Sequence, residues 1–175
     1  AFSQENWHRP QNEIQDLTKL LNYFLNHKVK TIIDQEIRLL VIGDYHKFGS
    51  KIADKIEELQ KLSANYETTL TICLNYGSRQ EIIKAIRQII KDHEANNKFI
   101  DEKEFTNYLY TGLMPDPDLI IRTGGEFRLS NFLLWQAAYS ELFFTDKLWP
   151  DFTENDFLEA LAEFKKRNRR YGSGN

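Results

Sequence analysis

The chain has 175 residues, of which 41% are hydrophobic and 28% are charged. This length and composition are typical of one globular domain over residues 1–175, and they exclude an intrinsically disordered chain. With 23 basic and 26 acidic residues, the formal net charge of −3 argues against a nucleic-acid-binding protein.

The sequence contains no apolar stretch that approaches the roughly 20 residues needed to cross a bilayer. The single cysteine, Cys73, cannot form a disulfide within the chain, which is typical of a reducing compartment. We therefore expect a cytoplasmic protein whose contact with lipid is peripheral, at the inner face of the membrane.

In the first half of the chain, apolar strands alternate with amphipathic helices. Helical spacing of apolar residues begins after Pro10 and runs to Leu25. The runs "IRLLVIGD" and "TLTICLNYG" predict buried strands, and a helix is expected after each of them. The first of these helices begins at Ser50 and ends near Leu62, and the second covers "SRQEIIKAIRQIIKDH".

The second half continues this alternation with shorter elements. Asp101 can cap a short helix that ends near Tyr110, and Pro115-Asp116-Pro117 predicts a turn before the strand "DLIIR". Residues 131–138 are expected to be helical, "ELFFT" extended, and residues 153–170 a final amphipathic helix. The alternation predicts an α/β fold, with a central parallel sheet flanked by helices.

Polar clusters follow the predicted strands, at residues 3–9, 43–44, 75–79 and 122–130. In parallel sheets, ligands bind beyond the carboxyl ends of the strands. We therefore expect the functional site at that edge of the sheet.

The cluster from Arg122 to Ser130 has the groups that suit a diphosphate. Gly124-Gly125 permits positive φ and close backbone approach, and Arg122, Arg128 and Ser130 supply two guanidinium groups and a hydroxyl before an expected helix start. A tight turn whose arginines pair with Glu126 or Asp118 explains the same residues equally well, so the two interpretations stay open.

Two further clusters are weaker. The loop "SQENWHR" could line a site, or it could cap the first helix and carry an exposed ion pair. Glu141, within an aromatic run, could bind Mg²⁺ beside a diphosphate, or it could pair with an arginine. The histidines lack metal-ligand spacing, and the sequence has no Walker A loop, GxGxxG motif or G-x-S-x-G elbow.

Taken in order, four stretches resemble the cis-prenyltransferases, most closely the bacterial undecaprenyl diphosphate synthases. They are "AFSQENWHRP", "LTICLNYGSRQEI", "DLIIRTGGEFRLSNFLLWQAAYSELFFTDKLWPDF" and the tail "RRYG". The resemblance implies a homodimer that elongates farnesyl diphosphate with isopentenyl diphosphate in the presence of Mg²⁺. The implied product is undecaprenyl diphosphate, the precursor of a lipid carrier for cell-wall polysaccharide synthesis.

The resemblance also implies roles for individual residues. Arg122, Arg128 and Ser130, with Leu129 between the last two, would hold the diphosphate of isopentenyl diphosphate. Asn6 would help remove the proton after condensation, and Glu141 would belong to the Mg²⁺ environment. The remaining substrate-binding residues would be Ser3, Gln4, Glu5, Trp7, Arg9 and, in an R-x-G tail with Gly172, Arg170.

One part of the family pattern is missing from this sequence. The family has a strand followed by M-D-G-N-G-R, whose aspartate binds Mg²⁺, and nothing here matches that motif. We expect the motif to precede Ala1 in the intact protein, so that the fold lacks its N-terminal strand and helix. A non-catalytic partner subunit of the same family and a phosphate-binding regulatory domain are the alternatives.

Overall fold

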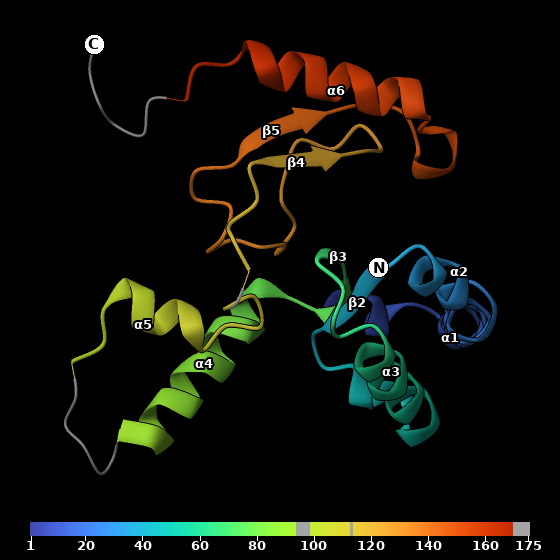
Figure 1. Cartoon of the computed structure of the whole chain (residues 1–175), viewed down its shortest axis with the longest axis vertical. Coiled ribbons are helices and arrows are strands. Elements are labelled where there is room, and N and C mark those ends of the chain that lie inside the picture. The colour runs from blue at the N-terminus through green and yellow to red at the C-terminus, as the bar shows by residue number, and fades with distance from the viewer. Residues whose placement is uncertain (94–98, 113, 170–175) are drawn as a thin grey trace. The chain divides into compact units, whose positions relative to one another are not determined.

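The computed structural model describes residues 1–93, 99–112 and 114–169. The chain divides into two compact units, Ala1–Gly112 and Leu113–Asn175, which are described separately below (Figure 1). Both units consist of parallel strands with helices packed against them, so the predicted α/β class is confirmed.

The first unit contains a three-stranded parallel sheet in the order β1-β3-β2. The strands are β1 (Phe2–Ser3), β2 (Ile37–Ile42) and β3 (Thr68–Tyr76). The central strand, β3, pairs with β2 from Thr68 to Cys73 and with β1 at Leu74 and Tyr76. The two predicted strands of this half are confirmed, and their carboxyl ends meet at one edge.

The helices of the first unit also follow the predicted pattern. They are α1 (Gln11–His27), α2 (Val29–Asp34), α3 (Ser50–Leu62), α4 (Ser78–His93) and α5 (Glu102–Asn107), with 3₁₀ helices η1 (Gln4–His8) and η2 (Tyr45–Phe48). The Asp101 side chain caps α5 by accepting from Glu104 N at 2.7 Å. This helix ends at Asn107 and not at the predicted Tyr110.

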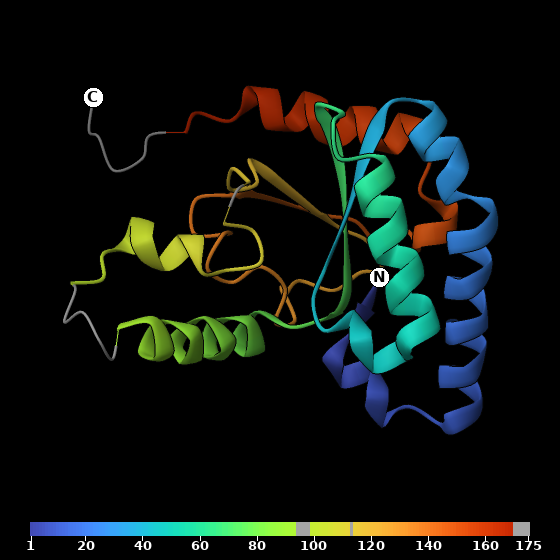
Figure 2. The same cartoon turned by 60° about the horizontal axis from the view of Figure 1, so that its bottom comes forward.

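The core of the first unit lies between the sheet and the helices α1, α2 and α3. Both ribbon views show α3 beside α1 (Figures 1 and 2). The buried side chains of this core are Phe2, Leu25, Val29, Leu39, Val41, Ile52, Ile56, Leu59 and Leu74. Because they come from every layer, burying them holds the strand ends of this unit in place.

Glu81 joins α4 to the strand before it and to the segment after α5. The residue is 2% exposed, and its carboxylate accepts from Tyr76 Oη at 2.6 Å and from Tyr110 N at 2.8 Å. Burial and the hydrogen bond to Glu81 raise the pKa of Tyr76 above its ordinary value, so the phenol remains a proton donor.

The second unit contains a two-stranded parallel sheet, β4 (Leu119–Arg122) and β5 (Glu141–Phe144). A short 3₁₀ helix, η3 (Trp149–Asp151), precedes α6 (Glu154–Lys166), which packs against β5. The final helix therefore ends before the predicted Arg170, because Arg167 is already extended, with ψ of 137°.

The predicted helix over residues 131–138 is wrong, because this segment forms turns. Ser130, Asn131 and Leu133 have φ values of 48°, 62° and 46°. Residues with left-handed backbone cannot continue a right-handed helix. No helix therefore begins after Ser130. The free backbone N–H groups of a helix N-terminus, which were expected to face a diphosphate, are not available there.

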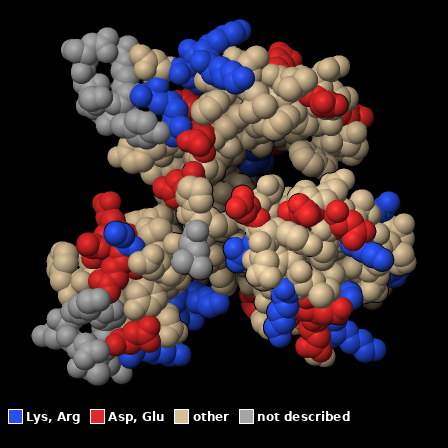
Figure 3. Space-filling view, viewed as in Figure 1, with Lys and Arg blue, Asp and Glu red and all other residues tan. Residues whose placement is uncertain are grey.

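The surface of the first unit carries charges of both signs. On the face shown in Figure 3, its basic and acidic side chains are interspersed and do not gather into one basic patch. No helix in the described part of the chain is long and apolar enough to span a membrane.

Candidate functional site

The turn after β4 is held by backbone hydrogen bonds to the segment after β5. Thr145 N donates to Arg122 O at 3.0 Å, Gly125 N to Thr145 O at 2.9 Å, and Gly124 N to Lys147 O at 2.7 Å. Both glycines have positive φ, as the sequence indicates. Because their amides already have acceptors, the glycine pair shapes the turn and does not present free N–H groups to an anion.

Arg122 holds the rest of this turn together through its side chain. Its Nη1 donates to Arg128 O at 2.5 Å and to Ser130 Oγ at 2.9 Å. The structure thus brings Arg122, Arg128 and Ser130 together, with Leu129 between the last two. Among the described residues, Arg122 Nε and Nη2 have no hydrogen-bond partner, so these N–H groups remain able to bind an anion.

Arg128 makes one of the pairings that the sequence left open. Its Nη1 pairs with Glu126, and the Arg128 side chain is 61% exposed. An exposed ion pair contributes about 1 kcal/mol or less, so a diphosphate could displace Glu126 at small cost. Asp118 does not pair with either arginine of the turn but with Arg169.

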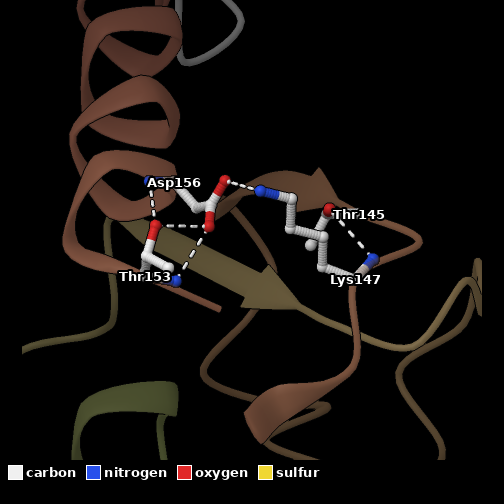
Figure 4. A network of polar contacts seen from close by, with 4 residues as sticks. All are labelled: Thr145, Lys147, Thr153 and Asp156. Atoms are coloured by element: carbon white, nitrogen blue, oxygen red, sulfur yellow. Dashed lines mark hydrogen bonds and ion pairs between the residues drawn. The ribbon is translucent and has the colours of Figure 1, made fainter. Parts of the chain in front are cut away.

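A polar network at the start of α6 fixes the segment that holds the glycine turn (Figure 4). Lys147 Nζ donates to Asp156 at 2.5 Å, and Thr153 N and Oγ1 donate to the same carboxylate at 2.8 and 2.7 Å. The hydrogen bond from Lys147 and those from Thr153 lower the pKa of Asp156 to about 2. The network joins the N-terminus of α6 to residues 145–147, and through them to the turn at 124–125.

In the first unit, η1 carries the cluster that follows β1. Asn6 Oδ1 accepts from Ser3 N at 2.8 Å, so this side chain caps the start of η1. Arg9 forms an exposed ion pair with Glu13 at 3.5 Å, as the alternative interpretation expected. Gln4 is half-buried and Glu5 is exposed on the same helix.

Trp7 makes the contact that sequence reasoning missed. Its Nε1 donates to Asn75 Oδ1 at 2.8 Å, across 68 residues of sequence. Asn75 belongs to a polar cluster after a predicted strand, but nothing in the pattern connected it to Trp7. Its position directly before Tyr76-Gly77, at the end of an apolar run, was the available signal.

Glu141 lies at the opposite end of the second sheet from Arg122. In the parallel register, Glu141 pairs with Leu119 and Arg122 pairs with Phe144. The two positions are three residue steps apart along the strands, which is roughly 10 Å. Glu141 accepts from Arg167 Nη1 at 2.8 Å, so the predicted alternative, a pairing with an arginine, is present.

Among the described residues, a metal site built from protein ligands alone would require several ligating side chains close together. No three His, Cys, Asp or Glu side chains among them lie close enough to hold a metal ion. The metal role of Glu141 therefore stays a prediction. Arg170 and Gly172, predicted for the tail, lie outside the described residues.

A family model described as "Putative undecaprenyl diphosphate synthase" matches residues 1–172. The chain belongs to the undecaprenyl diphosphate synthase family of prenyltransferases. An isoprenyl transferase of Fusobacterium nucleatum is 47% identical over 98% of this chain and 74% of its own length. A (2E,6E)-farnesyl-diphosphate-specific ditrans,polycis-undecaprenyl-diphosphate synthase of Photorhabdus laumondii is 46% identical over 98% of this chain and 69% of its own length.

Solved structures of the family agree with the fold. Lavandulyl diphosphate synthase from Lavandula x intermedia, in complex with dimethylallyl diphosphate, has a TM-score of 0.94 at 36% identity and covers 99% of this chain and 77% of its own. A probable undecaprenyl diphosphate synthase from Campylobacter jejuni has a TM-score of 0.89 at 33% identity and covers 99% of this chain and 81% of its own. The resemblance seen in the sequence and the family fold are both confirmed.

Proposed function

We propose that this prenyltransferase condenses isopentenyl diphosphate repeatedly onto farnesyl diphosphate and makes undecaprenyl diphosphate. The observation that carries the proposal is the group formed by Arg122, Arg128 and Ser130 in a chain of this family. The names of the Fusobacterium and Photorhabdus relatives support the substrate class. The product would be the precursor of a lipid carrier for cell-wall polysaccharide synthesis.

Arg122, Arg128 and Ser130 would bind the diphosphate of isopentenyl diphosphate. Arg122 brings N–H groups that have no partner among the described residues, and Arg128 would exchange Glu126 for the diphosphate. A guanidinium matches phosphate oxygens because its N–H groups form a planar fork. Each charge-assisted hydrogen bond would contribute about 1.5–3 kcal/mol.

The reaction breaks the bond between the allylic carbon C1 and its diphosphate oxygen. The double bond of isopentenyl diphosphate attacks that carbon. Loss of a proton from C2 of the isopentenyl unit then forms the new double bond. The products are inorganic diphosphate and a prenyl diphosphate longer by one isoprene unit. Because the two substrates must lie in contact, most of the protein's task is orientation.

Asn6 and its neighbours in η1 would line the reacting centre. An amide is a weak base, and Asn6 Oδ1 already accepts from Ser3 N, so Asn6 would act through a water molecule or a diphosphate oxygen. The other proposed contacts to substrate, on η1 and at its two capping positions, are Ser3, Gln4, Glu5, Trp7 and Arg9.

Mg²⁺ dependence, a homodimer, peripheral membrane attachment and a substrate contact by Arg170 are further proposals that rest on the family resemblance. Mg²⁺ is commonly held by one or two carboxylates together with substrate phosphates, which fits a diphosphate substrate. The family match over residues 1–172 supports one catalytic domain along the chain.

Product analysis tests this function and its alternatives. The full-length protein is incubated with radiolabelled isopentenyl diphosphate and farnesyl diphosphate, with and without Mg²⁺. We expect label in a long-chain lipid only with both substrates and Mg²⁺. If labelled lipid appears only after a second subunit of the family is added, the result would favour the alternative of a non-catalytic partner subunit. If the protein binds phosphate but makes no lipid product, the result would favour a phosphate-binding regulatory domain.

A further inference from the structure

We infer that Asn75 is a positioning residue that fixes the indole of Trp7, and through it η1, at the carboxyl ends of the three strands of the first unit. We call Asn75, Trp7 and Asp44 the Asn75 clamp. The consequence for catalysis rests on the proposed function, whereas the clamp itself rests on contacts within the first unit.

Asn75 is buried, with 1% exposure, at the end of β3. Its Oδ1 accepts from Trp7 Nε1 at 2.8 Å, and its Nδ2 donates to Asp44 O at 2.7 Å. Its backbone carbonyl also accepts from Asp44 N at 3.2 Å. One side chain at the end of β3 therefore joins that strand to the segments that follow β1 and β2.

The close approach of β2 and β3 at this edge allows the clamp to form. Gly43, with φ of 110°, lies directly before Asp44, and a Cβ built on it would be 2.2 Å from Leu74 O. Any larger residue there would push the Asp44 backbone away from Asn75.

The edge-to-face, tilted and cation–π contacts of the Trp7 ring do not by themselves fix the position of its indole N–H. Phe2 and Phe48 have ring centroids 5.1 Å from that of Trp7, and Lys47 Nζ lies 4.7 Å from the Trp7 centroid. Such contacts tolerate changes in the χ1 and χ2 angles that move the indole nitrogen. The hydrogen bond from Nε1 removes that freedom, because N–H donors prefer a nearly straight geometry.

The hydrogen bond from Asn75 to Asp44 positions the residues that pack against the Trp7 ring. Asp44 directly precedes η2, the element that carries Lys47 and Phe48. By donating to Asp44 O, Asn75 holds the start of η2, while its acceptor oxygen holds Trp7. A neutral amide is required here because one group must donate and accept at once.

The backbone of Asn75 restricts this position further. Its φ is 50°, a left-handed value that most residues with a Cβ avoid but that asparagine and aspartate adopt more readily. Glutamine has the same functional group but a longer side chain and a lower tolerance of this backbone. Asparagine therefore suits this position both because of its side-chain amide and because it tolerates a left-handed backbone.

Trp7 directly follows Asn6 on η1, so the clamp sets where η1 places its side chains. The proposed diphosphate contacts of isopentenyl diphosphate come from other residues, Arg122, Arg128 and Ser130. Loss of the clamp should therefore lower kcat with little change in KM for isopentenyl diphosphate. A misplacement of about 1 Å at a reacting centre can cost about a hundredfold in rate.

Three variants of the full-length protein test the clamp. Asn75→Gly removes the amide and keeps the left-handed backbone accessible, Asn75→Asp keeps an acceptor and loses the donor, and Trp7→Phe removes the indole N–H. The control is Asn22→Asp, an exposed site on α1 where the acceptor for Asn26 is retained.

The first measurement is the indole N–H resonance of Trp7 in a nitrogen–proton NMR spectrum, assigned by its loss in Trp7→Phe. We expect it to move upfield in Asn75→Gly and to stay in place in Asn22→Asp. An unmoved resonance in a folded Asn75→Gly variant would overturn the clamp. This readout does not need catalytic activity, so it separates failure of the clamp from failure of the proposed function.

The second measurement is steady-state kinetics. We expect Asn75→Gly and Trp7→Phe each to lower kcat by about tenfold to a hundredfold, and their effects on kcat not to add in the double variant. Asn75→Gly, whose residue is not a proposed substrate contact, should leave KM for isopentenyl diphosphate within about twofold. If Asn75→Gly does not fold, Asn75→Asp carries the test, because the lost donor to Asp44 should still lower kcat. Wild-type kcat in a folded Asn75 variant, or full additivity with Trp7→Phe, would contradict the positioning role.

Discussion

Arg122 Nη1 lies 2.9 Å from Ser130 Oγ, across eight residues of a chain segment that has no regular secondary structure. The same nitrogen donates to Arg128 O, so one guanidinium organises the turn that contains all three proposed diphosphate contacts. This arrangement places the turn before any ligand binds, which reduces the ordering cost of binding.

Gly43→Ala is expected to destabilise the first unit by about 3 kcal/mol or more, because the new Cβ meets Leu74 O at 2.2 Å and φ is 110°. Gly49→Ala is the matched control, since it has φ of 96° but no atom within 4 Å of the new Cβ. We expect Gly49→Ala to cost less than Gly43→Ala, about 1–3 kcal/mol, because it adds backbone strain without a contact. Urea unfolding measures both variants, and equal losses of stability would show that the contact with Leu74 is relieved without cost.

Asp156→Asn is expected to lower the melting temperature, and the loss should depend on pH. The folded-state pKa of Asp156 is lowered to about 2, from an ordinary value of 3.8, first by the hydrogen bond from Lys147. A lowered carboxyl pKa stabilises the fold above pH 3.8, and this stabilisation is lost as pH falls toward 2.

Thermal unfolding of Asp156→Asn and wild type is compared at pH 6 and near pH 2, with Asp151→Asn on η3 as the control. The difference between Asp156→Asn and wild type should be large at pH 6 and small near pH 2. A difference that is equal at the two pH values would mean that the Lys147–Asp156 network does not stabilise the start of α6.

Glu141→Gln and Arg167→Met are expected to destabilise the second unit, the first by about 1 kcal/mol and the second at least as much. Glu141→Gln weakens the partly buried pair, and Arg167→Met also removes the bonds to Glu163 and Leu142 O. The metal role predicted for Glu141 also implies that Glu141→Gln raises the Mg²⁺ concentration for half-maximal activity, whereas Arg167→Met leaves it as in wild type. An equal Mg²⁺ requirement in the two variants would contradict that role.

Much of the fold could be predicted because strands whose carboxyl-terminal halves pack into the core leave apolar runs, such as "IRLLVI" and "TLTICLNY". The capping of α5 by Asp101 could also be predicted, since the interaction is local. Residues 131–138 could not, because their apolar composition suits a helix whereas the left-handed backbone at Ser130, Asn131 and Leu133 is set by the surrounding turn.

The candidate site could likewise be predicted from the sequence only in part. The positive φ of Gly124 and Gly125 could be inferred from residue type, but the use of their amides by Thr145 and Lys147 depends on how β4 and β5 pair. The link between Trp7 and Asn75 crosses 68 residues, and no local pattern specifies it. Sequence periodicity shows which residues are polar at a strand end, but tertiary packing decides which of them meet.

Binding of isopentenyl diphosphate through Arg122 is the central claim, and steady-state kinetics of Arg122→Ala in the full-length protein test it most directly. Loss of charge-assisted hydrogen bonds to the diphosphate should raise KM for isopentenyl diphosphate by about tenfold to a hundredfold. The exposed Arg87→Ala on α4 serves as the control and should behave as wild type. A folded Arg122→Ala variant with wild-type KM for isopentenyl diphosphate would contradict the account.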